Sequence, residues 1–284
     1  MPELPEVEVA RRQLRAWARD RKILDAHAEK TRVIRGQQPR RFAELAGLRL
    51  MDVERAGKWM LLVFDGGEGL LSHLGMTGKW VRRSEDEPPP SHVRATLLLD
   101  DGHAVDYRDP RLFGRLIRGK AGGLRALPAW QSLGPDPLLG IDEQRLARLL
   151  GKTRRSIKEA LMDQRLLAGL GNIHVGESLH RAGLNPQRLA PSLTELEVKR
   201  LAEGIDQSLR FALALEDTPE PITYVEEGGE NRFLVYAHAG EPCRTCATTI
   251  ERIVQGGRST FFCRRCQPPV RARAQGKRKV AGKR

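Results

Sequence analysis

Four cysteines form the clearest chemical pattern in the sequence. They stand in two CxxC pairs with sixteen residues between the pairs: Cys243, Cys246, Cys263 and Cys266. This spacing can bring four thiolates to one tetrahedral zinc ion. Two disulfides are the alternative, although they suit a cytosolic chain poorly and make no use of the CxxC geometry. Because four protein ligands leave no open coordination position, we expect one structural Zn²⁺ that does no chemistry itself.

The residues between the two cysteine pairs predict a two-stranded ribbon. Gly256 and Gly257 form its turn, and Arg252 and Arg258 place positive charge near the tip. A ribbon of this kind can enter a DNA groove or hold another protein.

The second reactive group is the amine at the start of the chain. Pro2 follows the initiator Met, which is routinely removed before a small residue, so we expect a free secondary amine. An α-amino group has a pKa near 8, about two units below that of lysine, and a useful fraction of it is an uncharged nucleophile at neutral pH. Attack on the anomeric carbon of a sugar would give an iminium, with Glu3 placed to supply a proton. On their own, Pro2 and Glu3 are better explained as ordinary residues of the first turn of a helix.

The spacing of apolar residues changes along the chain, and each stretch predicts different elements to position these groups. Apolar residues recur at spacings of three and four from Leu4 to Trp17, which predicts a helix directly after the amine. From Leu48 to about Arg118, short apolar runs alternate with turns such as Asp65–Gly67 and Asp100–Gly102, a pattern typical of β-hairpins. After a turn-rich linker the pattern becomes helical, with helices expected at 141–150, 156–163, 175–182 and 194–215.

Charge and hydropathy limit the classes of function. The chain has 49 Lys+Arg against 36 Asp+Glu, a net charge of +13, and seven of the basic residues lie in the last 18. The composition of these last 18 residues cannot form a core, but it offers a weak, salt-sensitive anchor for a polyanion. No apolar run approaches the roughly 20 residues that span a bilayer, and the acidic start is not a secretory signal. We expect a cytoplasmic protein without a membrane partner.

The opening Pro2–Glu8, together with motifs along the chain, resembles the bacterial formamidopyrimidine-DNA glycosylase family. The resemblance covers the first helix, 57–58, 73–78, 109–114, 133–138, 163–186 and the zinc module. It implies a bifunctional DNA glycosylase and abasic-site lyase that removes 8-oxoguanine and formamidopyrimidines from double-stranded DNA and cleaves the strand by β,δ-elimination. In that family the N-terminal Pro is the nucleophile, the next Glu a general acid, and the Lys of a Gly-Lys strand a further catalytic group. By position these residues are Pro2, Glu3 and Lys58.

The resemblance also implies an α+β multi-domain fold. We expect an N-terminal β-sandwich with an N-terminal helix, a helical domain containing a helix-two-turns-helix motif, and a C-terminal zinc ribbon. The expected boundaries are 1–130 for the catalytic sandwich, 131–140 for a linker, 141–235 for the helical domain, 236–266 for the ribbon and 267–284 for a disordered basic tail.

Gly169–His174 lies between two predicted helices. Its glycines permit a close backbone approach, and the amides of the following helix together with Asn172 can hold a phosphate. An ordinary helix corner would explain the glycines too, but the resemblance identifies the helix-two-turns-helix. It also implies phosphate contacts by Lys158, Arg258 and His92. His174 replaces the Tyr usual after Asn-Ile and is left out of the expected site.

By the same resemblance, Met76, Arg111 and Phe113 fill the void that a flipped nucleotide leaves in the duplex. Arg111 faces the orphaned base and contacts DNA, and Phe113 wedges the stack. Without the resemblance, Met76 and Phe113 would be core residues beneath loops. These three residues, together with Leu4, favour this family over the endonuclease VIII branch, whose opening commonly reads Pro-Glu-Gly-Pro.

The chain departs from the family between the last helix and the zinc module. The family often has a Thr-Thr-Leu-Arg-Asp-Phe-like loop that covers the flipped purine, whereas Thr218–Phe233 is acidic and glycine-containing. We therefore expect a smaller preference for 8-oxoguanine over ring-opened purines and abasic sites. Two alternatives stay open: the same chemistry on other lesions such as oxidised pyrimidines, and a non-catalytic zinc-ribbon protein that binds nucleic acid. We expect a monomer.

Overall fold

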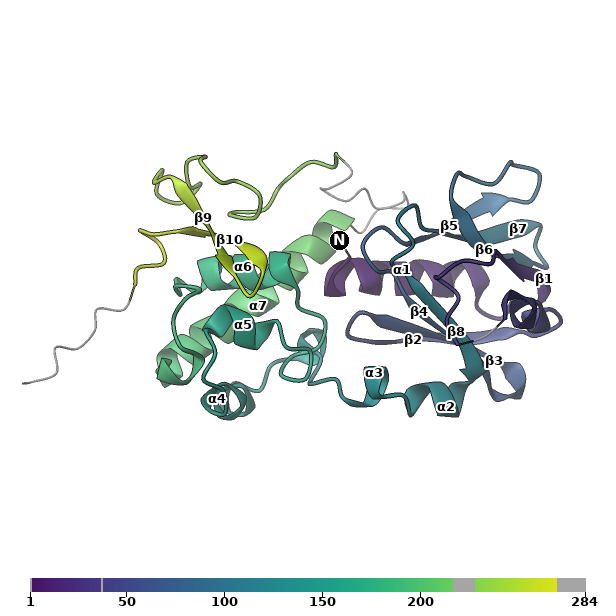
Figure 1. The fold of residues 1–284 in the computed structure, drawn as a ribbon, viewed down its shortest axis with the longest axis horizontal. Coiled ribbons are helices and arrows are strands. Elements are labelled where there is room, and N and C mark those ends of the chain that lie inside the picture. Colours follow the sequence, from purple (N-terminus) through teal and green to yellow (C-terminus); the bar gives the residue numbers. More distant parts are fainter. Residues whose placement is uncertain (1, 37, 217–227, 270–284) are drawn as a thin grey trace, which may run out of the picture.

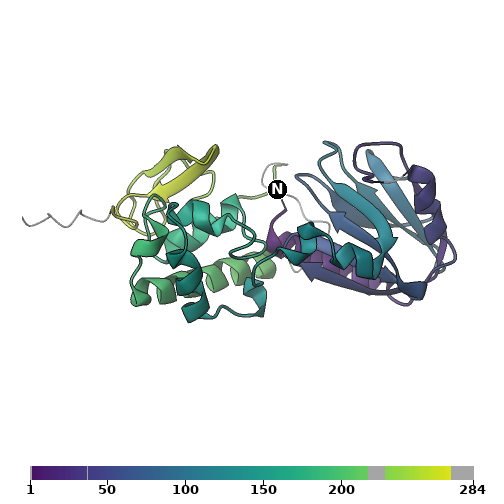
Figure 2. The ribbon, with the colours of Figure 1, turned by 60° about the horizontal axis from the view of Figure 1, so that its bottom comes forward.

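The computed structural model describes residues 2–36, 38–216 and 228–269. A β-sandwich forms the N-terminal half, and helices that carry a two-stranded ribbon form the C-terminal half (Figures 1 and 2). Most of the segment expected to differ from the family, at 217–227, and the tail from 270 onward lie outside the described residues. Within the described part of the chain, no helix is both long enough and apolar enough to cross a membrane.

Helix α1 (Leu4–Ala18) confirms the helix predicted directly after the amine. Pro5 stands in its first turn, where a missing amide costs no hydrogen bond. The apolar stripe is divided between two cores, because Leu4 packs with the helices whereas Val7 and Leu14 pack inside the sandwich. The start of α1 is therefore held where the two halves meet (Figure 1).

Two antiparallel four-stranded sheets form the sandwich. One has the order β1-β6-β7-β5 and the other β2-β3-β4-β8. The strands are β1 (Ile23–Ala28), β2 (Leu50–Ala56), β3 (Trp59–Phe64), β4 (Glu68–His73), β5 (Lys79–Ser84), β6 (Val93–Leu99), β7 (His103–Arg108) and β8 (Arg115–Lys120). The expected turns at 65–67 and 100–102 join β3 to β4 and β6 to β7. Strand β1 was not expected, because only two of its six residues are buried and the alternation is lost.

Strand β3 is apolar on both faces. Met60 and Leu62 face the core between the sheets, while Trp59 and Leu61 face a second, smaller core. Helices α2 (Ala121–Arg125) and α3 (Pro128–Gln131) cover that outer core. A strand buried on both sides reads as a continuous apolar run rather than an alternating one.

The turn between β2 and β3 consists of Gly57 and Lys58. Lys58 therefore stands in a turn, which corrects the expectation that it lies in a strand. Gly57 has a φ of +54°, and a Cβ there would lie 3.2 Å from both the Cβ of Ala168 and the amide nitrogen of Gly169. The hairpin tip thus lies directly against the helical half.

The helical half contains the four expected helices, α4 (Glu143–Gly151), α5 (Ile157–Leu161), α6 (Asn172–Arg181) and α7 (Glu195–Glu216). Helix α7 begins at the predicted capping box: the Glu197 amide donates to Thr194 Oγ1 at 3.4 Å, and the Thr194 amide donates to Glu197 Oε2 at 2.8 Å. Short 3₁₀ turns connect the elements of both halves, at Pro39–Leu45 (η1), Asp65–Gly67 (η2), Pro137–Leu139 (η3) and Ala190–Ser192 (η4).

The ribbon consists of β9 (Ile250–Gln255) and β10 (Arg258–Cys263), and its strand β10 packs on α6. Its turn is the expected glycine pair, with φ values of +55° and +73°. Gln267, assigned from the sequence to the disordered tail, is buried and donates to the Leu184 carbonyl at 2.8 Å. The ordered ribbon therefore includes Gln267.

Candidate active site

Pro2 lies in a pocket of about 260 Å³ at the junction of the two halves. The N-terminus stands there in both ribbon views (Figures 1 and 2). Sandwich, helical half and ribbon all contribute to its wall, which is formed by Pro2, Lys58, Trp59, His73, Gly75, Leu133, Met162, Gln164, Leu170, Gly171 and Arg258. The pocket therefore brings together Pro2, Lys58 and Arg258, which lie far apart in the sequence.

Glu3 is fully buried, and backbone amides hold its carboxylate. Oε2 accepts hydrogen bonds from the amides of Gly171 at 2.8 Å and His174 at 3.1 Å, and Oε1 accepts one from Ile173 at 2.9 Å. These amides belong to the first turn of α6, where they have no partner within the helix and the helix dipole favours a negative charge. The start of α6 thus fixes Glu3 across the junction between the halves.

Gly171 makes this arrangement sterically possible. A Cβ at position 171 would lie 2.3 Å from Glu3 Oε1 and 2.6 Å from Lys58 Nζ. Both functional groups therefore occupy space that any other residue type would take. Contact of this kind is a physical reason for glycine at 171, in addition to the turn geometry considered from the sequence.

Lys58 has an altered acidity in this pocket. Burial lowers the pKa of its ammonium group; the nearby negative charges of Glu3 and Glu6 oppose that effect, and the charge of Arg258 adds to it. Lys58 is consequently easier to deprotonate than a surface lysine. Its amine can therefore give up a proton more readily, and it lies in the same pocket as Pro2.

His73 is a pocket residue that the sequence analysis did not single out. Its Nδ1 accepts a hydrogen bond from the Gly75 amide at 3.0 Å, and its ring packs edge-on against Trp59 with centroids 4.7 Å apart. Burial, together with the charges of Lys58 and Arg115, lowers its pKa to about 4. The ring is therefore neutral at neutral pH, with the proton on Nε2 available for donation. The sequence did offer a signal for this residue, because His73 ends an apolar strand and begins the 73–78 motif that resembles the family.

Lys158 and Asn172 both hold the zinc ribbon. Lys158 is only 2% exposed and donates from Nζ to the Ser259 carbonyl at 3.1 Å and to Thr260 Oγ1. Asn172 Nδ2 donates to the same Ser259 carbonyl at 2.9 Å. Burial and the charge of Arg258 lower the pKa of Lys158 to about 8. The structure thus places the Lys158 amine inside the protein rather than on a surface open to DNA.

The three expected void-filling residues lie together on the sandwich. Arg111 is exposed, Met76 is half-buried, and Phe113 is 44% exposed, so Phe113 is not a core residue. The guanidinium carbon of Arg111 lies 5.2 Å from the Phe113 ring centroid. A Cβ on Gly75 would lie 2.5 Å from the carbonyl carbon of Phe113, which shows how closely the two turns meet. His92 is exposed in a left-handed turn, with a φ of +66°.

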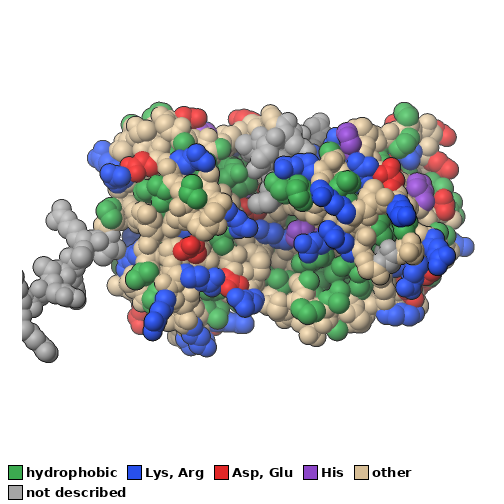
Figure 3. All heavy atoms as spheres, viewed as in Figure 1, with side chains coloured by type: hydrophobic (Ala, Val, Ile, Leu, Met, Phe, Trp, Pro, Cys, Tyr) green, Lys and Arg blue, Asp and Glu red, His purple; other side chains and the backbone are tan. Residues whose placement is uncertain are grey.

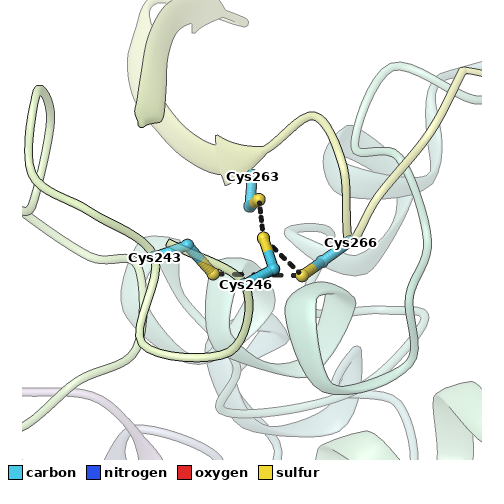
Figure 4. A group of neighbouring side chains, drawn as sticks. All are labelled: Cys243, Cys246, Cys263 and Cys266. Atoms are coloured by element: carbon cyan, nitrogen blue, oxygen red, sulfur yellow. Dashed lines mark hydrogen bonds between the residues drawn. The ribbon is translucent and has the colours of Figure 1, made fainter. Parts of the chain in front are cut away.

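The four cysteine sulfurs form a compact cluster (Figure 4). All lie within 4.8 Å of one another, with Sγ–Sγ distances of 3.4 Å for Cys246–Cys263, 3.5 Å for Cys246–Cys266 and 3.9 Å for Cys243–Cys266. A zinc tetrahedron with bonds of about 2.3 Å has edges of about 3.8 Å. Disulfide sulfurs lie about 2.05 Å apart, so the disulfide alternative is wrong. The cluster fits one structural zinc with no open position.

Three family models match the chain in succession. They are the formamidopyrimidine-DNA glycosylase N-terminal domain at residues 1–116, the H2TH domain of the same enzyme at 133–220, and a zinc finger found in FPG and IleRS at 240–269. The formamidopyrimidine-DNA glycosylase of Desulfitobacterium hafniense is 37% identical over 274 residues, which are 94% of this chain and 100% of the relative. That of Thermus thermophilus is 39% identical over 277 residues, or 94% and 98%.

Solved structures agree with these matches. The crystal structure of the MutM (Fpg) protein of T. thermophilus superposes with a TM-score of 0.80 at 36% identity, covering 94% of this chain and 98% of that one. The Lactococcus lactis Fpg complex with abasic-site DNA gives a TM-score of 0.84 at 31% identity, covering 94% and 100%.

Fold, site and comparisons together define a zinc-containing DNA glycosylase of base excision repair. The chain belongs to the formamidopyrimidine-DNA glycosylase family. It is accordingly an enzyme that removes oxidised purines and has the family's abasic-site lyase activity, with one structural zinc. This excludes the non-catalytic alternative.

Proposed function

We propose that Pro2, after removal of Met1, is the nucleophile for both activities. The neutral amine forms a bond to the anomeric carbon of a flipped, damaged nucleotide, and the bond from that carbon to the base breaks. The base leaves with the bonding electrons and takes a proton from water. Glu3 takes the proton released by the amine and delivers it to the ring oxygen as the sugar opens to an iminium. Loss of a proton from C2′ then expels the 3′-phosphate, and a further elimination expels the 5′-phosphate.

One observation carries this proposal: the amides of α6 hold the Glu3 carboxylate beside the pocket that contains Pro2 and Lys58. An acid directly after the nucleophile, fixed from both halves of the molecule, can act at the sugar without any contact to the base. Lys58, whose pKa burial lowers, is a further group for proton transfer during elimination.

The substrate we propose is double-stranded DNA containing oxidised purines or abasic sites. Solved relatives from L. lactis hold abasic-site and Fapy-dG DNA. Figure 3 shows Lys and Arg side chains gathered along the middle of one face, where the two halves meet. We propose that Asn172, Arg258, Lys158 and His92 contact phosphates there, and that Met76, Arg111 and Phe113 fill the void left by the flipped nucleotide.

For Lys158 the proposal has a structural condition. Its amine is buried against β10, so a phosphate contact requires its bonds to Ser259 and Thr260 to be exchanged on binding. We also propose that the enzyme acts as a monomer in the cytoplasm, with the chromosome. A single sedimentation species at the mass of one chain would support the first point.

Borohydride trapping on an abasic duplex tests the nucleophile. The unmodified enzyme should give a reduced covalent complex, and a protein shown by mass spectrometry to keep an N-terminal extension should give none while still shifting the duplex in a gel. The matched control carries the same extension at the C-terminus and should trap normally. Full trapping by the N-terminally extended protein would contradict the proposal.

A further inference from the structure

Arg32 belongs to none of the motifs described above, yet it holds the turn that carries Phe113. It lies in the segment after β1 and reaches the turn across the surface of the sandwich. Nη2 donates to the carbonyl of Arg111 at 2.8 Å, and Nε donates to the carbonyl of Leu112 at 2.9 Å. The guanidinium carbon lies 5.1 Å from the centroid of the Phe113 ring. The Arg32 side chain thus contacts three successive residues, 111–113.

The turn needs such support because its backbone is strained. Leu112 has a φ of +58°, in the left-handed region that costs a branched residue about 1 kcal/mol or more. This conformation sends Leu112 inward against the sandwich core and leaves Phe113 nearly half exposed. Hydrogen bonds to the carbonyls of this turn help to offset the cost of that conformation.

Asp109 fixes the other side of the same turn. Its Oδ2 accepts from the Gly114 amide at 2.7 Å, and its Oδ1 accepts from Thr77 Oγ1 at 2.8 Å, in the turn that carries Met76. Asp109 is fully buried and therefore sets the base of the turn. Arg32 acts at the tip, where the two exposed residues project.

We propose that Arg32 is a positioning residue for insertion into the duplex, an inference that rests on the proposed function. By holding both carbonyls, it sets Arg111 and Phe113 in the projecting conformation before DNA binds, so the turn need not be ordered during insertion. Only a planar guanidinium can make the two parallel hydrogen bonds and lie over the ring as well. Arg32 is not among the residues that line the pocket of Pro2. It should therefore affect extrusion of a paired nucleotide but not chemistry at a sugar that is already accessible.

The test compares Arg32→Lys and Arg32→Ala with the unaltered enzyme on two substrates. One is 8-oxoguanine paired with cytosine in a duplex, where insertion is required. The other is an abasic site in a single strand, where there is no paired nucleotide to replace. Arg35→Ala is the matched control, since Arg35 is an exposed arginine of the same segment.

We expect single-turnover excision from the duplex to fall about tenfold in both Arg32 variants, and cleavage of the single strand to stay within about twofold. The fluorescence of 2-aminopurine placed beside the lesion should rise more slowly by the same factor, because it reports insertion without chemistry. Arg35→Ala should match the unaltered enzyme on both substrates.

Two results would overturn the inference. Equal losses on both substrates would show a general structural role. Normal excision by Arg32→Lys, with Arg32→Ala weakening binding to undamaged duplex and lowering its salt dependence, would show a phosphate contact instead. Failure of Pro2 as the nucleophile would leave the 2-aminopurine comparison intact, so the two proposals fail separately.

Discussion

The pocket around Pro2 and the turn around Phe113 are held in opposite ways. Pocket residues come from sandwich, helices and ribbon, and Glu3 is bound by amides about 170 positions away in the chain. Phe113, Arg32 and Asp109 all belong to the sandwich, where Phe113 and Arg32 lie at the surface and Asp109 is buried. Chemistry at the sugar should therefore depend on how the two halves meet, whereas insertion into the duplex should depend on one half alone.

The largest effect should come from Glu3→Gln. Glutamine cannot carry the proton from the amine to the sugar, and its NH₂ group would face amide donors of α6. We expect base excision to fall by about 10²–10⁴-fold with binding to lesion-containing duplex retained. Single-turnover excision and gel-shift titration measure the two quantities. Excision within tenfold of the unaltered enzyme would remove Glu3 from the chemistry.

Gly171→Ala should have the next largest effect and lower the rate of base excision about 100-fold. Its Cβ would displace both Glu3 Oε1 and Lys58 Nζ, which tests the junction without altering any reacting group. The matched control is Gly176→Ala in the same helix, where a Cβ meets no atom within 4 Å. That variant should keep full activity and melt at an equal or higher temperature, because alanine favours helix. Equal activity in the two variants would show that the contact at 171 is unimportant.

Phe113→Ala should impair insertion into the duplex and leave chemistry at the sugar intact. We expect excision of 8-oxoguanine paired with cytosine to fall about tenfold and cleavage of a single-stranded abasic site to be unchanged. Since the ring is 44% exposed, stability should change by less than about 1 kcal/mol. If the single-stranded reaction slowed as much as the duplex reaction, the separation of the two regions would be wrong.

Loss of the ion pairs around Glu8 should have the smallest effect on catalysis but a clear effect on stability. Arg55 binds Glu8 of α1 at 2.8 Å and Asp136 of the linker at 2.5 Å. Burial alone would raise the pKa of Glu8, but hydrogen bonds from Arg11, Arg55 and Arg12 outweigh it and lower the pKa to about 2. The folded pKa lies below the unfolded value of about 4.3, so this stabilisation is complete above that pH and is lost as pH falls toward 2.

Urea unfolding of Glu8→Gln between pH 7 and pH 3 measures this contribution. At neutral pH the variant should be roughly 2–3 kcal/mol less stable than the unaltered enzyme, and the difference should shrink as the solution becomes more acidic. Asp206→Asn is the control, because its pair with Arg210 is exposed and contributes little. A difference that is constant with pH would show that Glu8 does not titrate as described.

Local patterns predicted much of the fold. The spacing of apolar residues predicted α1, the Asp-Gly turns predicted two hairpins, Thr194 and Glu197 predicted the start of α7, and the cysteine spacing predicted the zinc cluster. Strand β1 could not be predicted, since its burial does not alternate. Gln267 looked like tail because two of its partners, Leu184 and Asn185, lie far away in sequence.

The site was predictable as a set of residues but not as an arrangement. Resemblance pointed to Pro2, Glu3 and Lys58, whereas the amides that hold Glu3 act through backbone atoms, and of the residues that carry them only Gly171 is constrained in type by the contact. The role of His73 depends on burial beside Trp59 and Lys58, which only the folded chain creates. Arg32 is one of many arginines until the turn at 111–113 is seen against it.

Pro2 and Lys58 both line the pocket, and we propose that Pro2 rather than Lys58 attacks the sugar. Burial lowers the pKa of Lys58 and makes it the natural competitor. Peptide mapping by mass spectrometry of the enzyme reduced with borohydride on an abasic duplex decides between them. We expect the sugar adduct on the nitrogen of Pro2, in an N-terminal peptide that lacks Met1. An adduct on Lys58, with Pro2 unmodified, would contradict it.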